Sequence, residues 1–250
     1  MERDYQFNYS SLKPSVFNTE QRERKANTIV KVCQDFFQTA DLSDLDLLDV
    51  GSSSGIIDNY LADHFRSVSG IDIDKAAMEH AQGTFRKANL HFSYGDAMRL
   101  AQADASIDVV VCSHVYEHVP DASSMFGEIV RVLKPGGVCY FSGNNRFMFM
   151  EPHYKLPLLS LLPRPLAHRY MRITGKGHYY HEKHLSYWAL KSLCCGFKRI
   201  DYSAKVIADP DRFGVAYMLP KGSIKHRVAT FVANHFPWAT PHIWILQKQA

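Results

Sequence analysis

The sequence contains no apolar run long enough to cross a membrane. Its longest apolar stretch, Leu156 to Leu162, is interrupted by Pro157 and followed by Pro163, whereas a spanning helix needs about 20 apolar residues. We therefore expect no transmembrane segment. The first residues, Met1 to Tyr5, are mostly charged and have no apolar core, which is not the pattern of a secretory signal and predicts a cytoplasmic protein.

Cysteine is scarce, and neither sign of charge is in large excess. The spacing of the 5 cysteines matches neither a zinc site nor an even set of disulfides, and Cys112 and Cys139 fall inside apolar runs. We therefore expect buried, reduced thiols. The formal net charge is +4, with Lys and Arg spread along the chain, which disfavours a dedicated nucleic-acid-binding protein. The cysteines are Cys33, Cys112, Cys139, Cys194 and Cys195.

Strand-like and helix-like segments alternate along most of the chain. Several of the strand-like segments are apolar almost throughout, which is typical of a parallel sheet covered by helices on both faces. We predict a single α/β domain over residues 1–250, doubly wound and mostly parallel. The expected strands are 45–50, 68–73, 90–94, 107–112, 138–142, 196–202 and 242–247, and the expected helices are 19–39, 56–65, 76–87 and 123–133.

A glycine-containing loop, Gly51 to Gly55, joins the first expected strand to the following helix. Such a loop places backbone N–H groups and the positive end of a helix beside a ligand. Asp72 lies 21 positions after Gly51, at the end of the second strand, where a carboxylate can accept hydrogen bonds from both hydroxyls of a ribose. Together these features predict a site for a cofactor that contains a nucleoside.

Five motifs follow one another along the chain, namely Leu47 to Gly55, Gly70 to Asp74, Tyr94 to Ala97, Ser106 to Val119 and Glu128 to Gly137. In this order they resemble the motifs of class I S-adenosylmethionine-dependent methyltransferases, in particular the methyltransferase type 11 branch with its quinone-biosynthesis enzymes. Ser53 stands where that family's Gly-x-Gly-x-Gly loop has its middle glycine. Asp49 fits the resemblance, since a carboxylate there would repel the pyrophosphate of a dinucleotide but attract the ammonium group of S-adenosylmethionine.

The resemblance implies a Rossmann-like, seven-stranded sheet with an inserted substrate cap, and S-adenosyl-L-methionine as the cofactor. It places Asp72 on the ribose, Ile73 beside the adenine and Asp96 on the adenine amino group. The cofactor-binding residues that it implies are Asp49, Gly51, Ser52, Ser53, Gly55, Asp72, Ile73, Asp96, Ala97 and Ser113.

Two irregular segments follow the fifth strand motif. Residues 144–193 lie where this family inserts its substrate-recognition cap, and their apolar residues and arginines suit an amphiphilic or anionic substrate, although a packed cap with solvated arginines fits equally. Residues 203–241 form a second insertion, in which apolar residues from Ile224 to Phe236 share one face of a predicted helix. Packing against the core is the first interpretation of that face, and peripheral contact with a membrane or partner is the alternative. The arginines are Arg164, Arg169 and Arg172.

The expected reaction is methyl transfer to a small molecule such as a quinone precursor, a sugar or a secondary metabolite. A hydroxyl oxygen is the favoured acceptor, because His and Tyr side chains of the cap can remove its proton. His153 and His181 are the candidate general bases, and His118 either shapes the loop after the fourth strand or transfers a proton. No Cys or Asp joins His181 and its neighbouring histidines at ligand spacing, so we expect no metal.

Three other functions fit parts of the sequence. A protein or nucleic acid could be the methyl acceptor, although the Asn/Asp-Pro-Pro-aromatic signature of amino-directed enzymes is absent. A non-catalytic cofactor-binding protein would show the same loop. Gly51-x-Ser53-x-Gly55 also spells the nucleophile elbow of an α/β hydrolase, with Asp209 and His242 as candidate partners of Ser53. That hydrolase would leave Asp72 and Asp96 unexplained.

Overall fold

A computed structural model describes residues 4–249 of the chain. Its main sheet has seven strands, and β9 runs antiparallel to both of its neighbours while the other pairs are parallel. The predicted seven-stranded, mostly parallel sheet is thereby confirmed. In sheet order the strands are β3 (Leu90–Tyr94), β2 (Phe65–Asp72), β1 (Leu42–Val50), β4 (Ile107–Ser113), β5 (Leu133–Gly143), β9 (His242–Lys248) and β8 (Phe197–Asp201).

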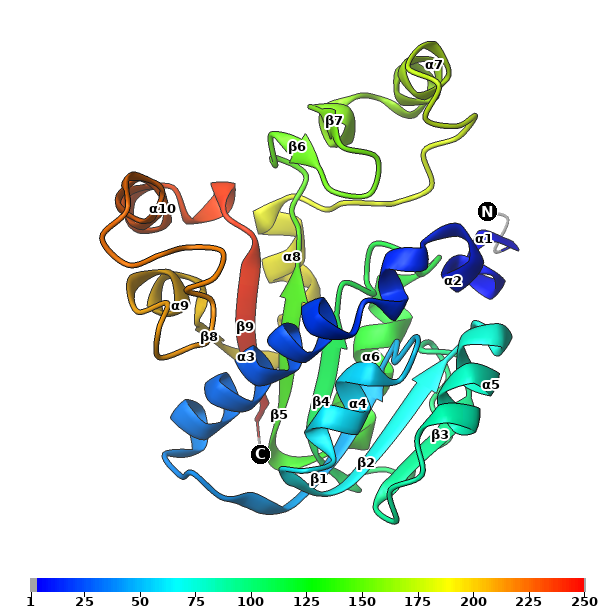
Figure 1. The fold of residues 1–250 in the computed structure, drawn as a ribbon, viewed down its shortest axis with the longest axis vertical. Helices are drawn as coiled ribbons and strands as arrows, with labels where there is room; N and C mark the ends of the chain where they lie inside the picture. Colours follow the sequence, from blue (N-terminus) through cyan, green and yellow to red (C-terminus); the bar gives the residue numbers. More distant parts are fainter. Residues whose placement is uncertain (1–3, 250) are drawn as a thin grey trace.

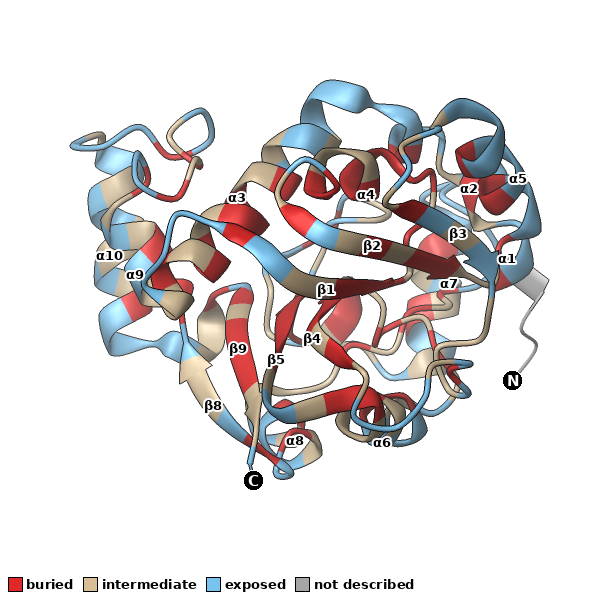
Figure 2. Cartoon of the chain, turned by 90° about the horizontal axis from the view of Figure 1, so that it is seen from below, coloured by how far each residue is buried: buried red, intermediate tan, exposed pale blue. Residues whose placement is uncertain are grey.

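Helices cover both faces of the sheet (Figure 1). Successive strand residues point to opposite faces, so Leu47 and Leu48 enter two separate hydrophobic clusters. Figure 2 shows that the central strands are the most completely buried part of the sheet. One cluster contains residues of α3 (Thr19–Phe37), α4 (Ile56–Leu61) and α9 (Ser203–Ala208), and the other contains residues of α6 (Ala122–Val132) and α8 (Tyr187–Leu193).

Local sequence signals set the ends of several helices. The side chain of Asn18 accepts a hydrogen bond from the backbone N–H of Gln21 and caps α3, and Asp74 caps α5 (Lys75–Thr84) in the same way. The predicted helix 56–65 is too long, because α4 ends at Leu61 and β2 begins at Phe65. Phe65 pairs with Leu42 of β1, and its buried ring completes the sheet's core.

The predicted cap rises beyond the carboxyl ends of the parallel strands (Figure 1). It has a small core of its own, which includes Leu159, Met171 and Tyr180. The last helix of the predicted cap range, α8, instead packs Leu190 into the cluster beneath the sheet. The cap elements are β6 (Met150–Glu151), β7 (Leu156–Pro157), η2 (Leu159–Leu161) and α7 (Arg164–Ile173).

The second insertion contains α10 (Ile224–His235), on which Ile224 is 81% exposed and Phe231 56% exposed. The interpretation of this face as core packing is therefore wrong, and contact with a membrane or partner stays a prediction.

Four cysteines are buried as expected, but Cys195 is exposed because it lies in the turn after α8. Among residues 4–249, no helix combines the length and the apolar character needed to cross a bilayer.

Candidate functional site

A pocket of about 310 Å³ lies at the carboxyl ends of the parallel strands, where open α/β sheets bind their ligands. Loops after β1 to β5 form one side of it. The segment before the sheet closes another side through α1 (Asp4–Phe7), α2 (Tyr9–Leu12) and α3, and the cap contributes His153. The site is thus assembled from parts of the chain that are more than 100 positions apart.

The structure brings most of the predicted cofactor-binding residues to this pocket. Asp49, Ser52 and Gly55 are the exceptions, because they do not line the pocket. Asp49 is only 3% exposed and Ser52 only 4%. The predicted residues that line the pocket are Gly51, Ser53, Asp72, Ile73, Asp96, Ala97 and Ser113.

Hydrogen bonds within the protein fix the loop after β1. The N–H groups of Gly51 and Ser52 both donate to the carbonyl oxygen of Ile71 at 2.9 Å, and the N–H of Ser53 donates to a carboxylate oxygen of Asp72 at 2.8 Å. The expectation that these N–H groups are presented to a ligand is therefore wrong, since β2 already uses them. Gly51 has φ of 87°, and an added Cβ would lie 2.5 Å from Cγ2 of Val115, so this position requires glycine.

Acidic side chains surround this loop. Ser52 Oγ donates to the fully buried carboxylate of Asp58 at 2.8 Å, and burial raises the pKa of Asp58 to about 7. Burial, together with the nearby Asp58 and Asp72, raises the pKa of Asp49 well above its ordinary value. Burial also raises the pKa of Asp72, although the N–H groups of Asp74 and Ser53 oppose it. This part of the pocket therefore favours a ligand with positive charge over a pyrophosphate.

Two cations of α3 form the opposite wall, and sequence reasoning missed both. Arg22 and Lys25 line the pocket, and neither side chain donates a hydrogen bond to a described residue. Burial lowers the pKa of Arg22, whose charge is felt by Asp49 and Asp72. Burial and the neighbouring Arg22 lower the pKa of Lys25 to about 8. The sequence signal for Arg22 and Lys25 was the charged stretch at the start of an amphipathic helix, but such a stretch is equally typical of a solvated helix face.

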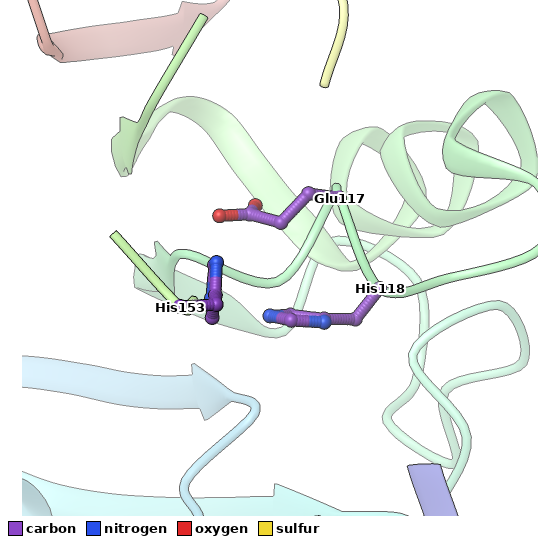
Figure 3. Close-up of side chains that lie close together, drawn as sticks. All are labelled: Glu117, His118 and His153. Atoms are coloured by element: carbon purple, nitrogen blue, oxygen red, sulfur yellow. The ribbon is translucent and has the colours of Figure 1, made fainter. Parts of the chain in front are cut away.

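Histidines and glutamates gather at the cap side of the pocket. Glu117 and His118 follow β4, and the His118 and His153 rings meet edge to face with centroids 5.1 Å apart. Figure 3 shows the Glu117 carboxylate and the His118 ring pointing toward His153. Nδ1 of His153 lies 2.7 Å from the buried Glu151 carboxylate. The third predicted base, His181, does not line this pocket.

The electrostatics of this corner follow from its burial. Burial lowers the pKa of His118 to about 4. Burial alone would raise the pKa of Glu117, but His114 and the other imidazoles outweigh it and lower that pKa to about 2. Burial opposes protonation of His153, yet Glu151 and two other carboxylates outweigh burial and raise its pKa.

Comparison with known proteins assigns a family to the central residues of the chain. Residues 48–141 match the family model described as a methyltransferase domain. A Mycolicibacterium smegmatis protein named "Probable S-adenosylmethionine-dependent methyltransferase" is 36% identical over 113 residues, which cover 45% of this chain and 43% of the relative. The ubiquinone biosynthesis O-methyltransferase of Pseudomonas fluorescens is 34% identical over 127 residues, which cover 47% and 53%. Residues 48–141 are a class I S-adenosylmethionine-dependent methyltransferase domain.

The similarity has limits of length and identity. The chain spans about half the length of the curated relatives it matches. The methyltransferase chain solved in complex with the Haloferax volcanii Trm112 methyltransferase activator superposes with a TM-score of 0.59 at 17% identity, over 98% of each chain. At that identity the structural likeness supports the fold of the methyltransferase domain and its flanking segments, and not a shared substrate.

The hydrolase alternative requires Asp209 and His242 beside Ser53. Asp209 instead pairs with Lys221 at 3.0 Å, and the buried ring of His242 stacks on Trp244 with centroids 4.7 Å apart. Neither lines the pocket of the methyltransferase domain. The structure therefore does not assemble the catalytic triad that these candidates would form.

Proposed function

We propose that the protein transfers a methyl group from S-adenosylmethionine to a hydroxyl oxygen of a small molecule. The observation that carries this proposal is a single pocket with Asp72 of the methyltransferase domain on one side and His118 and His153 on the other. Its volume of about 310 Å³ is at the lower end of the range for small-molecule sites. The name of the Pseudomonas fluorescens relative, an O-methyltransferase, supports oxygen as the acceptor atom.

The residues present fit the cofactor. S-Adenosylmethionine supplies an electrophilic methyl group on a positively charged sulfur. Asp72 would accept hydrogen bonds from the ribose hydroxyls, Ile73 and Ala97 would contact the adenine, and Asp96 would accept from the adenine amino group. The acidic side chains around the loop favour the positive charge. Arg22, whose charge is coupled to Asp49 and Asp72, would pair with the cofactor's carboxylate.

The chemistry asked of this chain is modest. The acceptor oxygen would take the methyl group, sulfur would keep the electron pair of the carbon–sulfur bond, and the hydroxyl proton would pass to a base at the cap side of the pocket. The chain contributes alignment of the two reactants and exclusion of water. His118 and His153 line the cap side of the pocket, and Glu151 orients the His153 ring. These two histidines would therefore act on the acceptor oxygen, whereas His181 does not line the pocket and is not proposed.

The surroundings favour an amphiphilic acceptor with an anionic group. Lys25 lies on the pocket wall and its charge is coupled to Glu117, at the cap side, so it would pair with a carboxylate or phenolate. The cap exposes large apolar side chains, of which Phe149 is 69% and Ile173 is 73% exposed. Of the predicted arginines, Arg164 bonds the carbonyl oxygens of Tyr180 and His181, so it supports the cap instead of binding substrate.

An acceptor series tests this function. Methyl-labelled S-adenosylmethionine is offered with an alkylated phenolic acid, its analogue without the alkyl chain and the matching aniline, and mass spectrometry locates the label. We expect oxygen methylation of the alkylated phenol. His153→Ala should lower kcat by about 100-fold or more without changing S-adenosylhomocysteine affinity, whereas the exposed His178→Ala should have no effect. Labelling of protein or RNA in place of every phenol would contradict the proposal.

A further inference from the structure

A buried carboxylate, Glu117, lies at the cap side of the pocket. The side chain of Glu117 is 0% exposed, and neither of its oxygens has a hydrogen-bond partner among residues 4–249. Nδ1 of His114 lies 3.4 Å from Oε1. Because an unsatisfied buried carboxylate is costly, its position indicates a ligand that the protein alone does not supply.

Two imidazoles point at the same place. Glu117, His118 and His153 each offer one ligand atom, and these three atoms lie within 4.8 Å of one another (Figure 3). Ligand atoms around a tetrahedral zinc ion are about 3.3 Å apart, as bond lengths near 2.0 Å require. Small rotations of the three side chains would therefore bring their ligand atoms to the separations that an ion requires.

The carboxylate behind His153 completes the pattern of a metal site. Glu151 lies 2.7 Å from Nδ1 of His153, and its second oxygen accepts from the N–H of Tyr154 at 2.8 Å. A carboxylate that holds the Nδ1 proton of a histidine leaves Nε2 as the free ligand atom and fixes the orientation of the ring, as is usual behind metal-binding histidines. Glu151 itself already uses both oxygens within the protein.

We propose that Glu117, His118 and His153 bind one divalent transition-metal ion with an open coordination position facing the pocket. Two nitrogens and one oxygen suit zinc and similar ions, whereas magnesium prefers oxygen ligands alone. His118 and His153 line the pocket, so the open position would take an oxygen of the acceptor and make its hydroxyl more acidic. This part of the inference rests on the proposed function, and it places the acceptor oxygen beside the cap.

Sequence patterns did not predict this site. The sequence was searched for a metal site only around His181 and its neighbouring histidines, whereas the proposed ligands come from the loop after β4 and from the cap. His118 and His153 are 35 positions apart. Only the docking of the cap onto the sheet brings His153 to Glu117 and His118.

Metal binding by the full chain, stripped of metal, tests the proposal. Calorimetry with Zn²⁺ should give one ion per chain, and Mg²⁺ should bind at least about 100-fold more weakly. Glu151→Gln should weaken Zn²⁺ binding by about 10- to 100-fold, and Glu117→Gln, His118→Ala and His153→Ala should weaken it more. The matched control His178→Ala replaces an exposed cap histidine and should bind Zn²⁺ as the wild type does.

Two measurements keep the outcome decisive. If Zn²⁺ binding survives Glu117→Gln and His118→Ala but is lost in His184→Ala, the ion occupies the enclosed set of Glu151, His153 and His184, and the proposal is wrong. X-ray absorption of the wild-type zinc complex should show two imidazoles, so a sulfur ligand or a third imidazole would overturn it even if a variant misfolds. Absence of zinc binding with intact S-adenosylhomocysteine binding overturns this inference alone, whereas absence of S-adenosylhomocysteine binding overturns the proposed function.

Discussion

Asp72→Asn should weaken S-adenosylhomocysteine binding without unfolding the protein. The carboxylate of Asp72 accepts two backbone hydrogen bonds, from Ser53 at 2.8 Å and from Asp74 at 2.9 Å. An asparagine offers one oxygen, and its NH₂ group would face the second N–H donor. Asp72→Asn therefore removes one charge-assisted hydrogen bond and weakens the other, which disorganises the loop that carries Ser53 and removes the charged acceptor for the ribose.

The size of the effect follows from these bonds. A hydrogen bond to a charged group contributes about 1.5–3 kcal/mol and a neutral one about 0.5–1.5 kcal/mol, so we expect a loss of about 2–3 kcal/mol, or about 30- to 150-fold in Kd. Calorimetry with S-adenosylhomocysteine measures it. The matched control is Asp63→Asn, because Asp63 is 64% exposed, pairs with Lys87 and does not line the pocket. A Kd within about threefold of the wild type in a folded Asp72→Asn protein would refute the role of Asp72.

Three further changes test the loop and the packing of the insertion. Ser53→Gly should retain cofactor binding and raise the free energy of unfolding by up to about 1 kcal/mol, because Ser53 has φ of 53°; a destabilised variant in urea unfolding would contradict this. Gly51→Ala should lower that free energy by about 2 kcal/mol through strain and the close contact with Val115, and Val115→Ala in the same chain should restore part of it. Asp35 bonds Tyr202 at 2.8 Å and pairs with Lys205 and Arg212; burial would raise the pKa of Asp35, but these partners outweigh it and lower the pKa. The stabilisation by the Asp35 carboxylate is therefore present above the unfolded pKa of about 3.9 and is lost as the pH falls through the folded pKa. Asp35→Asn should lower the free energy of unfolding by about 1–2 kcal/mol at pH 7. A loss that stays the same down to pH 3 would contradict this prediction.

The sheet was predictable because its residues carry the signal themselves. The bounds of β3 at residues 90–94 were predicted without error, and β4 differs from its prediction by one residue. Buried parallel strands need apolar residues on both faces, so they stand out in the sequence. Phe65 was misassigned because an apolar residue after a helix fits either helix or strand, and only its pairing with Leu42 decides.

The cofactor side of the site was more predictable than the acceptor side. Asp72 and Gly51 belong to contiguous strand-loop-helix motifs, whose local spacing survives folding. Arg22 reaches the pocket through the docking of a helix, and Glu151 acts through a tertiary contact to His153. No local pattern distinguishes such residues from solvated charges. The expectation that N–H groups of the loop face a ligand was wrong because β2 supplies the acceptor for these groups.

The central claim is that the pocket around Asp72 binds S-adenosylmethionine and its demethylated product. Isothermal titration of the full chain with S-adenosylhomocysteine, with NAD as the comparison ligand, tests it most directly. The acidic side chains behind and beside the loop predict one S-adenosylhomocysteine per chain and no heat with NAD. Tight NAD binding without S-adenosylhomocysteine binding would contradict the account.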